Sequence, residues 1–254
     1  MVDAYVLLTP SDYTSFQLAS PLDNGEQITV FNLNREKLGL VDDVTVTSDI
    51  NRQMYHGFEV SIQGRLPNGA TLLGGWFPER SLAVTCDTNN PNQLRFCDET
   101  GALYQELGAV PRMPFLHEFK FAAASPLPWG FNAGLSILSY AVGSGRQYGA
   151  VGASYLTVNW PVPANLFPGG RTQPVTVNLV APGTKHLERW NQVDVNLKRI
   201  VRLRRLEVQP TMEVFNLLNS GVALSTVETF GPSLDLPTRM LQGRMLKLSA
   251  LLKF

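Results

Sequence analysis

Apolar and polar residues alternate along most of this chain with a period of two. In the C-terminal stretch GRMLKLSALLKF, the residues Leu246, Leu248, Ala250, Leu252 and Phe254 fall on one face of an extended chain, and the positions between them are mixed. The stretches RWNQVDVNLKR, RLEVQPTMEVFN and GFEVSIQGRL alternate in the same way. This pattern predicts β-strands that have one apolar face and one polar face.

The same pattern predicts about nine strands in an all-β, antiparallel meander. They lie near residues 3–9, 27–33, 55–66, 70–77, 115–124, 130–140, 190–199, 204–216 and 244–254. Pro210 interrupts one of these segments, and because proline has no N–H to donate, it predicts a bulge or local irregularity there.

The connections between the predicted strands alternate in length. Short links are expected at Asn68-Gly69, which would supply the positive φ values of a tight hairpin, at SPLPWG (125–130) and at RIVRLRR (199–205). The long segments run over about 77–114, 141–189 and 217–243. Short turns at one end and long loops at the other are typical of outer-membrane β-barrels.

The tryptophans agree with that arrangement. If the short links are periplasmic, Trp76 and Trp190 lie at external strand ends and Trp129 lies at a periplasmic end. An aromatic girdle at both membrane interfaces requires such positions.

Composition narrows the class of protein further. The 254 residues carry 21 basic and 21 acidic side chains, so there is no electrostatic case for binding nucleic acid. Charged residues make up only 17%, and no apolar stretch is as long as a membrane-spanning helix. This leaves a β-rich soluble protein or a β-barrel, whose membrane signal is hidden in alternate residues.

Cys86 and Cys97 are the only cysteines, and they lie in the polar stretch TCDTNNPNQLRFC. Two cysteines with scattered histidines do not make a four-ligand zinc site, so we expect a loop-closing disulfide and an oxidising compartment. Two unpaired thiols are the alternative. The first residues lack the basic and apolar regions of a signal peptide, so we expect either a cytoplasmic protein or a piece of a longer chain.

Motifs for catalysis are not found. There is no G-x-S-x-G elbow, and GSGRQYG (143–149) has the wrong spacing for a dinucleotide loop. Asp42-Asp43 and the Asn- and Asp-rich cysteine loop are weak cation candidates. We therefore expect no enzyme, metal or cofactor. The lumen-facing charges of both signs are expected to line water as pairs, and they are Glu59, Arg65, Asp194, Lys198, Glu207 and Glu213.

Several stretches resemble known outer-membrane proteins. The C-terminal Leu246, Leu248, Leu252 and Phe254 match the insertion signal that the barrel assembly machinery reads. The stretch EVFNLLNS, with Glu213, Phe215, Asn216 and Asn219, resembles the penultimate-strand motif of TonB-dependent outer-membrane receptors. YHGFEVSIQGRLPNG and HEFKFAAASPLPWGFNAGLSI are similar to recurrent strand units of that family, and the set resembles the C-terminal barrel half of Oar-like receptors.

That resemblance implies a bacterial outer-membrane protein that takes up nutrients through a 22-strand barrel with an N-terminal plug coupled to TonB. Residues 1–254 would then be the C-terminal part of the barrel, without the plug or signal peptide. Outer-membrane lipid, the assembly machinery and the missing barrel half would be its partners, and TonB would act only through the missing plug. A stand-alone small barrel with a structural or adhesive role, and a soluble β-sandwich binding module, are the alternatives.

Overall fold

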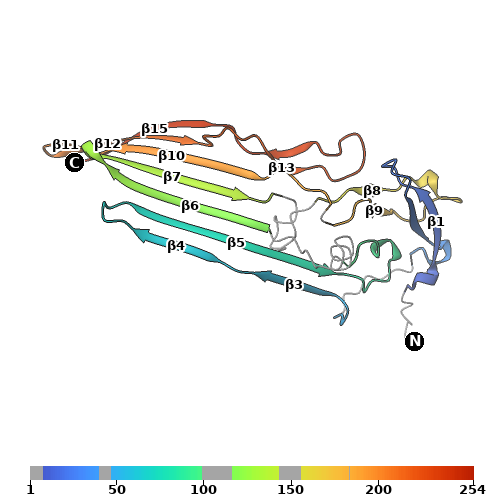
Figure 1. Ribbon diagram of the computed structural model, residues 1–254. Helices are drawn as coiled ribbons and strands as arrows, with labels where there is room; N and C mark the ends of the chain where they lie inside the picture. The colour runs from blue at the N-terminus through green and yellow to red at the C-terminus, as the bar shows by residue number, and fades with distance from the viewer. Residues whose placement is uncertain (1–7, 40–46, 99–115, 143–155, 183) are drawn as a thin grey trace, which may run out of the picture.

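The computed structural model describes residues 8–39, 47–98, 116–142, 156–182 and 184–254. A long antiparallel sheet occupies one end of the molecule, and shorter strands and loops form a cap at the other (Figure 1). The first described strand, β1 (Tyr13–Ala19), lies in the cap, and the C-terminus lies at the far tip of the sheet (Figure 1). Among the described residues, no helix is long and apolar enough to cross a membrane. The helical pieces described are single 3-10 turns: η1 (Pro10–Asp12), η2 (Arg35–Lys37), η3 (Pro91–Gln93), η4 (Pro128–Gly130) and η6 (Ala164–Leu166).

The main sheet has nine antiparallel strands, which confirms the predicted all-β meander. They are β3 (Arg52–Gly57), β4 (Val60–Arg65), β5 (Thr71–Val84), β6 (Leu116–Leu127), β7 (Phe131–Tyr140), β10 (Trp190–Arg199), β11 (Val201–Leu203), β12 (Leu206–Phe215) and β15 (Met245–Lys253). The order across the sheet is β15-β12-β10-β7-β6-β5, with β3 and β4 both pairing with β5, and β11 pairing with β12. Neighbouring strands therefore follow one another along the chain, as hairpins do.

Two prolines explain why two strands are each divided. β3 and β4 pair with β5 in one register, and β10 and β11 pair with β12 in one register. The gaps lie opposite Pro78 and Pro210. Phe58 donates its backbone N–H to the Pro78 carbonyl at 3.1 Å, but Pro78 has no N–H to return the bond. At Pro210 the ladder to β10 is interrupted as predicted, yet the register does not shift, so no bulge forms.

If each divided strand is counted once, the nine strands become seven passes of the chain across the sheet. The passes are joined at the tip by tight links. At the first link, Leu66 and Ala70 close the turn with a 2.8 Å hydrogen bond, and Gly69 has a φ of 82°. Asn68 does not adopt the positive φ that we predicted for it; instead its side chain accepts the Ala70 N–H at 3.1 Å.

The cap is built from three two-stranded units and the loops around them. The units are β1 (Tyr13–Ala19) with β2 (Gln27–Leu33), β8 (Asn159–Pro161) with β9 (Thr176–Asn178), and β13 (Ala223–Thr226) with β14 (Pro237–Met240). Its core is fully apolar and consists of Ile28, Val30, Val158, Trp160, Val162, Phe167, Val175, Val177 and Leu179. The largest buried cluster of the described chain thus lies in the cap and not on the sheet.

The predicted strand at 27–33 is therefore real but misplaced, because β2 pairs with β1 in the cap and does not join the main sheet. We did not predict β1, whose alternation is weak. Most of the strand predicted at 3–9 lies outside the described residues. The strand predicted at 70–77 continues to Val84, because β5 keeps pairing with β3 beyond that point.

Candidate functional site

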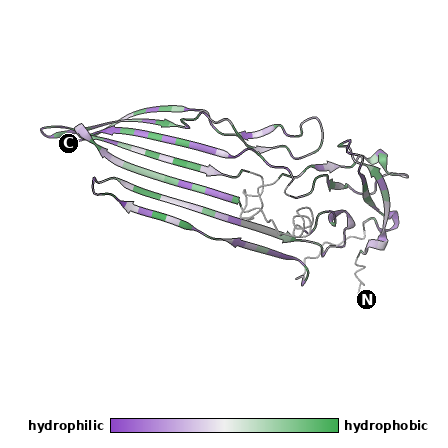
Figure 2. Ribbon diagram, in the orientation of Figure 1, coloured by the Kyte–Doolittle hydropathy of each residue, from purple (hydrophilic) through white to green (hydrophobic). Residues whose placement is uncertain are grey.

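The main sheet has one apolar face that runs across all of its passes. Directly paired residues of antiparallel strands lie on the same face. One row joins Ile62, Gly74, Phe121, Ile137 and Val193 through successive pairings. The next row on this face, two residues nearer the tip, contains Leu72, Ala123, Leu135, Val195, Val214 and Leu246. Figure 2 shows the alternation of hydrophobic and hydrophilic residues along these strands.

Within the described part of the chain, this face is not covered. Ile62, Met212, Leu246 and Leu248 are between 43% and 71% exposed, although each lies among other apolar side chains. Large contiguous apolar surface is uncommon on a soluble monomer and marks a surface that contacts something else. We call this surface the apolar face.

Aromatic residues bound the apolar face on the side of the cap. The Trp76 ring stacks on Phe119 at 6.1 Å and meets Phe58 edge-on at 5.5 Å. The Trp76 indole N–H donates to His117 at 3.2 Å. Ser139, which pairs with Phe119, donates a hydrogen bond to Asn191 on β10. Both side chains are polar, so the apolar surface ends at this row.

The predicted girdle tryptophans lie at different points relative to the ends of their strands. Trp76 lies inside β5 and not at its end, because β5 continues to Val84. Trp190 starts β10, and its ring lies 5.5 Å from the Tyr140 ring. Trp129 lies in the β6–β7 link and is 84% exposed. Their membrane role remains a prediction.

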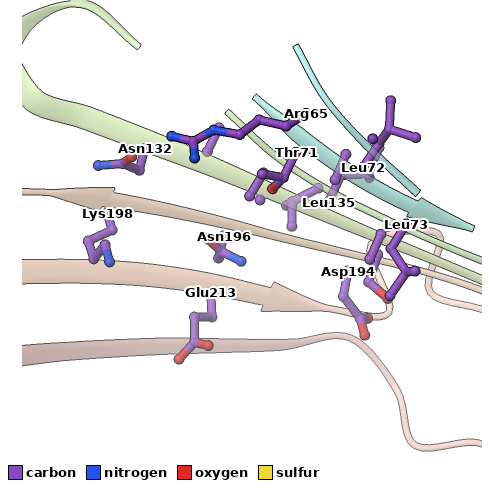
Figure 3. Close-up of a pocket in the computed structure, with 18 of the residues that line it drawn as sticks. Arg65, Thr71, Leu72, Leu73, Asn132, Leu135, Asp194, Asn196, Lys198 and Glu213 are labelled. Carbon is purple, nitrogen blue, oxygen red and sulfur yellow. The ribbon is translucent and has the colours of Figure 1, made fainter. Parts of the chain in front are cut away.

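The opposite face of the sheet is polar and contains a hollow of about 890 Å³, which we call the trough. Its floor lies on β6 and β7, where the side chains on this face are small: Ala122, Ala124, Gly134 and Ser136. Longer side chains rise on both sides, with Arg65 and Thr71 on one wall and Asp194, Asn196 and Lys198 on the other (Figure 3). The trough therefore exists because two adjacent central strands lack bulk.

Gly134 shapes the floor directly. A Cβ added at this glycine would lie 2.4 Å from the Asn196 side-chain nitrogen. Asn196 pairs with Gly134 across β7 and β10, and its amide lies over the glycine. The absence of a side chain at this position lets the amide lie flat against the sheet.

The acidic groups near the trough are engaged by neighbours. Glu213 forms an ion pair with Lys247 at 2.7 Å. Asp194 accepts hydrogen bonds from the Gln192 side chain at 2.8 and 2.9 Å and from the Asn216 backbone N–H at 2.8 Å. Glu207, nearer the tip, contacts Arg202 at 3.1 Å and Lys253 at 3.4 Å. Glu207 and Glu213 are thus paired with basic side chains, as expected. Asp194 is instead held by neutral donors, and Arg65 and Lys198 have no ion-pair partner among the described residues.

The EVFNLLNS stretch closes the cap end of β12. Asn216 is 2% exposed and has a φ of 50°. Its side-chain nitrogen donates to the carbonyls of Ser220 and Gln242, both at 2.8 Å, and its side-chain oxygen accepts the Ser220 N–H at 2.9 Å. Asn219, with a φ of 53°, accepts the Arg244 N–H at 2.9 Å.

The segment between β12 and β15 begins and ends beside these two asparagines. Their hydrogen bonds therefore connect its two ends. The other two motif residues face the polar side, because Phe215 lines the trough and Glu213 pairs with Lys247. The sequence resemblance identified the EVFNLLNS motif but did not predict these asparagine hydrogen bonds. We call them the EVFNLLNS clamp.

Cys86 and Cys97 form a disulfide that joins the end of β5 to the loop carrying η3. In that loop, Asn92 behaves like a paired strand residue, because it accepts the Phe31 N–H and donates to the Phe31 carbonyl, both at 2.8 Å. Arg95 donates to the Asn178 carbonyl and to Glu26, both at 2.7 Å. The disulfide loop thus connects the sheet to two units of the cap.

The polar groups of the cysteine loop, a weak cation candidate, form hydrogen bonds within the protein. Asp87 accepts from Ser48, and its backbone N–H donates to Asn51 at 2.8 Å. Asn90 caps η3 by accepting the Asn92 N–H at 3.1 Å. Within the described residues, no three His, Cys, Asp or Glu side chains gather as a metal site would require. Asp42-Asp43 and GSGRQYG lie outside the described residues.

The proposed insertion signal lies on the edge strand β15. Leu246, Leu248 and Leu252 are 63%, 71% and 51% exposed, and Phe254 is 98% exposed at the tip. All three leucines pair with apolar residues of β12, so they belong to the apolar face. Recognition by the assembly machinery remains a prediction.

Sequence reasoning missed the trough and the cap core. The small residues of β6 and β7 could have signalled the trough, since HEFKFAAASPL contains three consecutive alanines, but only the pairing shows that Gly134 lies beside Ala124. The cap core combines segments that are more than a hundred residues apart, and no local pattern connects them.

No protein-family model matches the chain, and no curated protein matches it. Among solved structures, the chain is similar to the outer membrane transporter YddB from Escherichia coli. The match has a TM-score of 0.42 and 10% sequence identity, and covers 95% of this chain and 28% of that one. The chain thus spans little more than a quarter of the transporter's length.

Proposed function

We propose that the chain forms part of the wall of a transport barrel in a bacterial outer membrane. The observation that carries this proposal is the exposed apolar face, which spans the sheet opposite a polar, hollowed face. A transmembrane barrel needs this division, because its outer surface contacts hydrocarbon and its inner surface contacts water.

The height of the apolar face supports the proposal. Along β6 it extends from Phe119 in the aromatic row to Leu127 beside the tip. Eight residues of strand span roughly 27 Å, and a tilt of about 40° reduces this to a height of roughly 21 Å. The outward apolar band of known outer-membrane barrels is about 25 Å tall.

The end of the band near the tip has the side chains that a membrane interface favours. The Arg199 guanidinium lies 5.1 Å from the centre of the Phe131 ring, at the last apolar row. Trp129 projects from the adjacent turn. A cation with an apolar stem and an exposed indole both suit the headgroup region.

A soluble β-sandwich is less compatible with these observations. A sandwich buries the apolar faces of two sheets against each other. In the described part of the chain, the buried apolar cluster lies in the cap, while apolar side chains of the main sheet, such as Leu248, remain exposed.

We further propose that the complete protein is a TonB-dependent receptor, related to the Oar-like group, that imports a nutrient. The EVFNLLNS clamp at the cap end of β12 supports this, because it gives the resembling motif a structural role. The missing barrel half would pair with the edges of the sheet, the plug would fill the lumen, and TonB would act through that plug. The cap would then face the exterior, where loops meet the ligand. In this proposal the chain has no enzymatic activity.

Labelling adjacent residues tests the membrane wall. Leu135 lies on the apolar face, and Ser136 lies on the trough floor of the same strand. Because the native cysteines are bonded to each other, Leu135→Cys and Ser136→Cys each introduce one free thiol for an environment-sensitive fluorophore. In the full chain reconstituted into phospholipid vesicles, we expect spin-labelled lipid acyl chains to quench the label at 135 at least fivefold more than the label at 136.

Equal quenching at the two positions, or none at either, would contradict a lipid-facing apolar surface. The receptor part of the proposal has a separate test. Sequencing the DNA upstream of Met1 should reveal a continuous reading frame for a plug and a signal peptide. Stop codons immediately upstream would contradict the receptor but leave the membrane wall standing.

A further inference from the structure

We propose that the trough binds a small organic anion that carries two or more carboxylate or phosphate groups. This inference rests on the proposed transport function and names the ligand class that the polar face would take. It follows from the shape of the trough and from the charges on its two walls.

The first observation is a contrast between acids and bases. The trough acids Asp194 and Glu213 have close partners, as described above. Arg65 and Lys198, which also line the trough, have no ion-pair partner among the described residues. A solvated anion would therefore meet two cations that have no ion-pair partner. Of the two acids, Glu213 is neutralised by Lys247, and the Asp194 oxygens are occupied by neutral donors.

The second observation is where these cations stand. Arg65 rises from β4 and Lys198 rises from β10, so they occupy opposite walls with β5, β6 and β7 between them. Arg65 is level with Asn196, so Lys198 lies four inter-strand steps of about 4.8 Å away and two residues farther along its strand. In a flat sheet this separates the two backbones by about 20 Å. Each side chain reaches about 6 Å from its Cα, given bond lengths near 1.5 Å. If both side chains reach toward each other, the remaining gap is about 8 Å, which suits one small anion that touches both cations.

The third observation is the chemistry between the cations. Asn132 pairs directly with Lys198, and Thr71 pairs directly with Arg65. An amide and a hydroxyl donate hydrogen bonds to carboxylate or phosphate oxygens without adding charge. The volume of about 890 Å³ lies within the range of small-molecule sites.

The test is calorimetric titration of citrate into the full chain in detergent micelles at low ionic strength. We expect citrate to bind, and we expect Arg65→Gln and Lys198→Gln each to weaken the affinity about tenfold, as loss of one charge-assisted contact does. Arg239→Gln, on exposed β14 in the cap, is the matched control and should leave the affinity unchanged.

A second pair of variants tests the shape. Ala124→Leu adds bulk to the trough floor and should weaken citrate binding, while Ala123→Leu adds the same bulk on the apolar face and should not. Circular dichroism checks that each variant keeps its strands.

Three results would overturn the proposal: no citrate binding, equal affinities in the wall variants and the control, or equal binding of a neutral disaccharide. Binding of an acidic hexapeptide with no binding of citrate would also overturn it, in favour of an acidic protein segment. Citrate binding with no lipid quenching at residue 135 would instead retain the trough and reject the membrane proposal. Lipid quenching at residue 135 with no citrate binding would retain the membrane proposal and reject the trough as an anion site.

Discussion

At the scale of single residues, asparagine side chains fix the local geometry at several places in this protein. Asn92 imitates a strand partner for Phe31, and Asn216 and Asn219 adopt left-handed backbone conformations that asparagine tolerates better than most residues. Each asparagine side chain hydrogen-bonds to backbone groups that do not pair with a neighbouring strand at that point. Such roles depend on one amide group and are sensitive to its replacement.

We expect Asn216→Asp to destabilise the chain by about 2–3 kcal/mol, because two partly buried hydrogen bonds to carbonyls lose their donor and the carbonyls face a carboxylate instead. Asn219→Asp is the matched control, since the Asn219 side chain acts as an acceptor for Arg244 and a carboxylate can still accept. Urea unfolding in detergent micelles, followed by tryptophan fluorescence, measures both. Equal destabilisation by the two variants would show that the donated bonds are not the cause.

The carboxyl group of Asp12, in the cap, should respond to acid. The backbone N–H of Thr9, at 2.8 Å, and then the Lys37 ammonium, at 3.1 Å, hold the Asp12 pKa below its ordinary value of 3.8. A lowered folded-state pKa contributes stability that is fully present above pH 3.8 and is lost as the pH falls through the folded-state pKa.

Carbon-13 NMR titration of the Asp12 carboxyl group measures this pKa. We expect a midpoint below 3.8 in the native chain and a higher midpoint in Lys37→Met. A native midpoint at or above 3.8 would contradict the assigned contacts.

At the scale of elements, the main sheet has a continuous register that two prolines conceal. Pro78 and Pro210 each remove a ladder donor, so strands that continue in register are divided into β3 with β4 and β10 with β11. The sequence predicted β3 and β4 mainly as one strand, at 55–66. It was wrong about β11, which it placed in the short link expected at 199–205.

We expect Pro78→Ala to restore one hydrogen bond, from residue 78 to the Phe58 carbonyl, because the reciprocal bond from Phe58 already exists. Such a bond contributes about 0.5–1.5 kcal/mol, and the greater freedom of alanine in the unfolded chain offsets part of this. Hydrogen exchange should show a new protected amide at residue 78. Exchange there at the rate of an open loop would contradict the continuous register.

At the scale of the whole molecule, the two ends are stabilised by different means. The cap buries an apolar core within itself, as Ile28 and Val30 at 0% exposure show. The main sheet exposes its apolar face, and its outer passes, β15 and β3 with β4, have a partner on one side only among the described strands. We therefore expect the stability of the sheet to depend on an apolar environment and that of the cap not to.

Removing detergent should separate these two behaviours. In the full chain, we expect amide exchange in β7 to become at least tenfold faster when micelles are diluted out, while exchange in β2 changes little. The reason is that only the sheet has apolar surface for detergent to cover. Exchange in β2 accelerating together with β7 would mean that the cap has no independent core.

The sequence predicted the features that depend on residues close together along the chain, and it missed those that depend on residues far apart. The alternation of MLKLSALLKF predicted a strand and its two faces because side chains of a strand point alternately to opposite sides. The Asn-Gly and Pro-Trp-Gly links predicted the turns because their backbone preferences are local. These features need no knowledge of distant residues.

Tertiary structure decided what depends on distant pairs. It placed β2 in the cap, since its apolar residues pack against Val158 and Trp160, far along the chain. It formed the trough by setting Ala124 beside Gly134, and it brought Arg65 and Lys198 to opposite walls. The sequence by itself determined which residues alternate and where the chain turns. Only the folded sheet determined which alternating faces meet, because strand pairing and loop packing join residues that no local pattern relates.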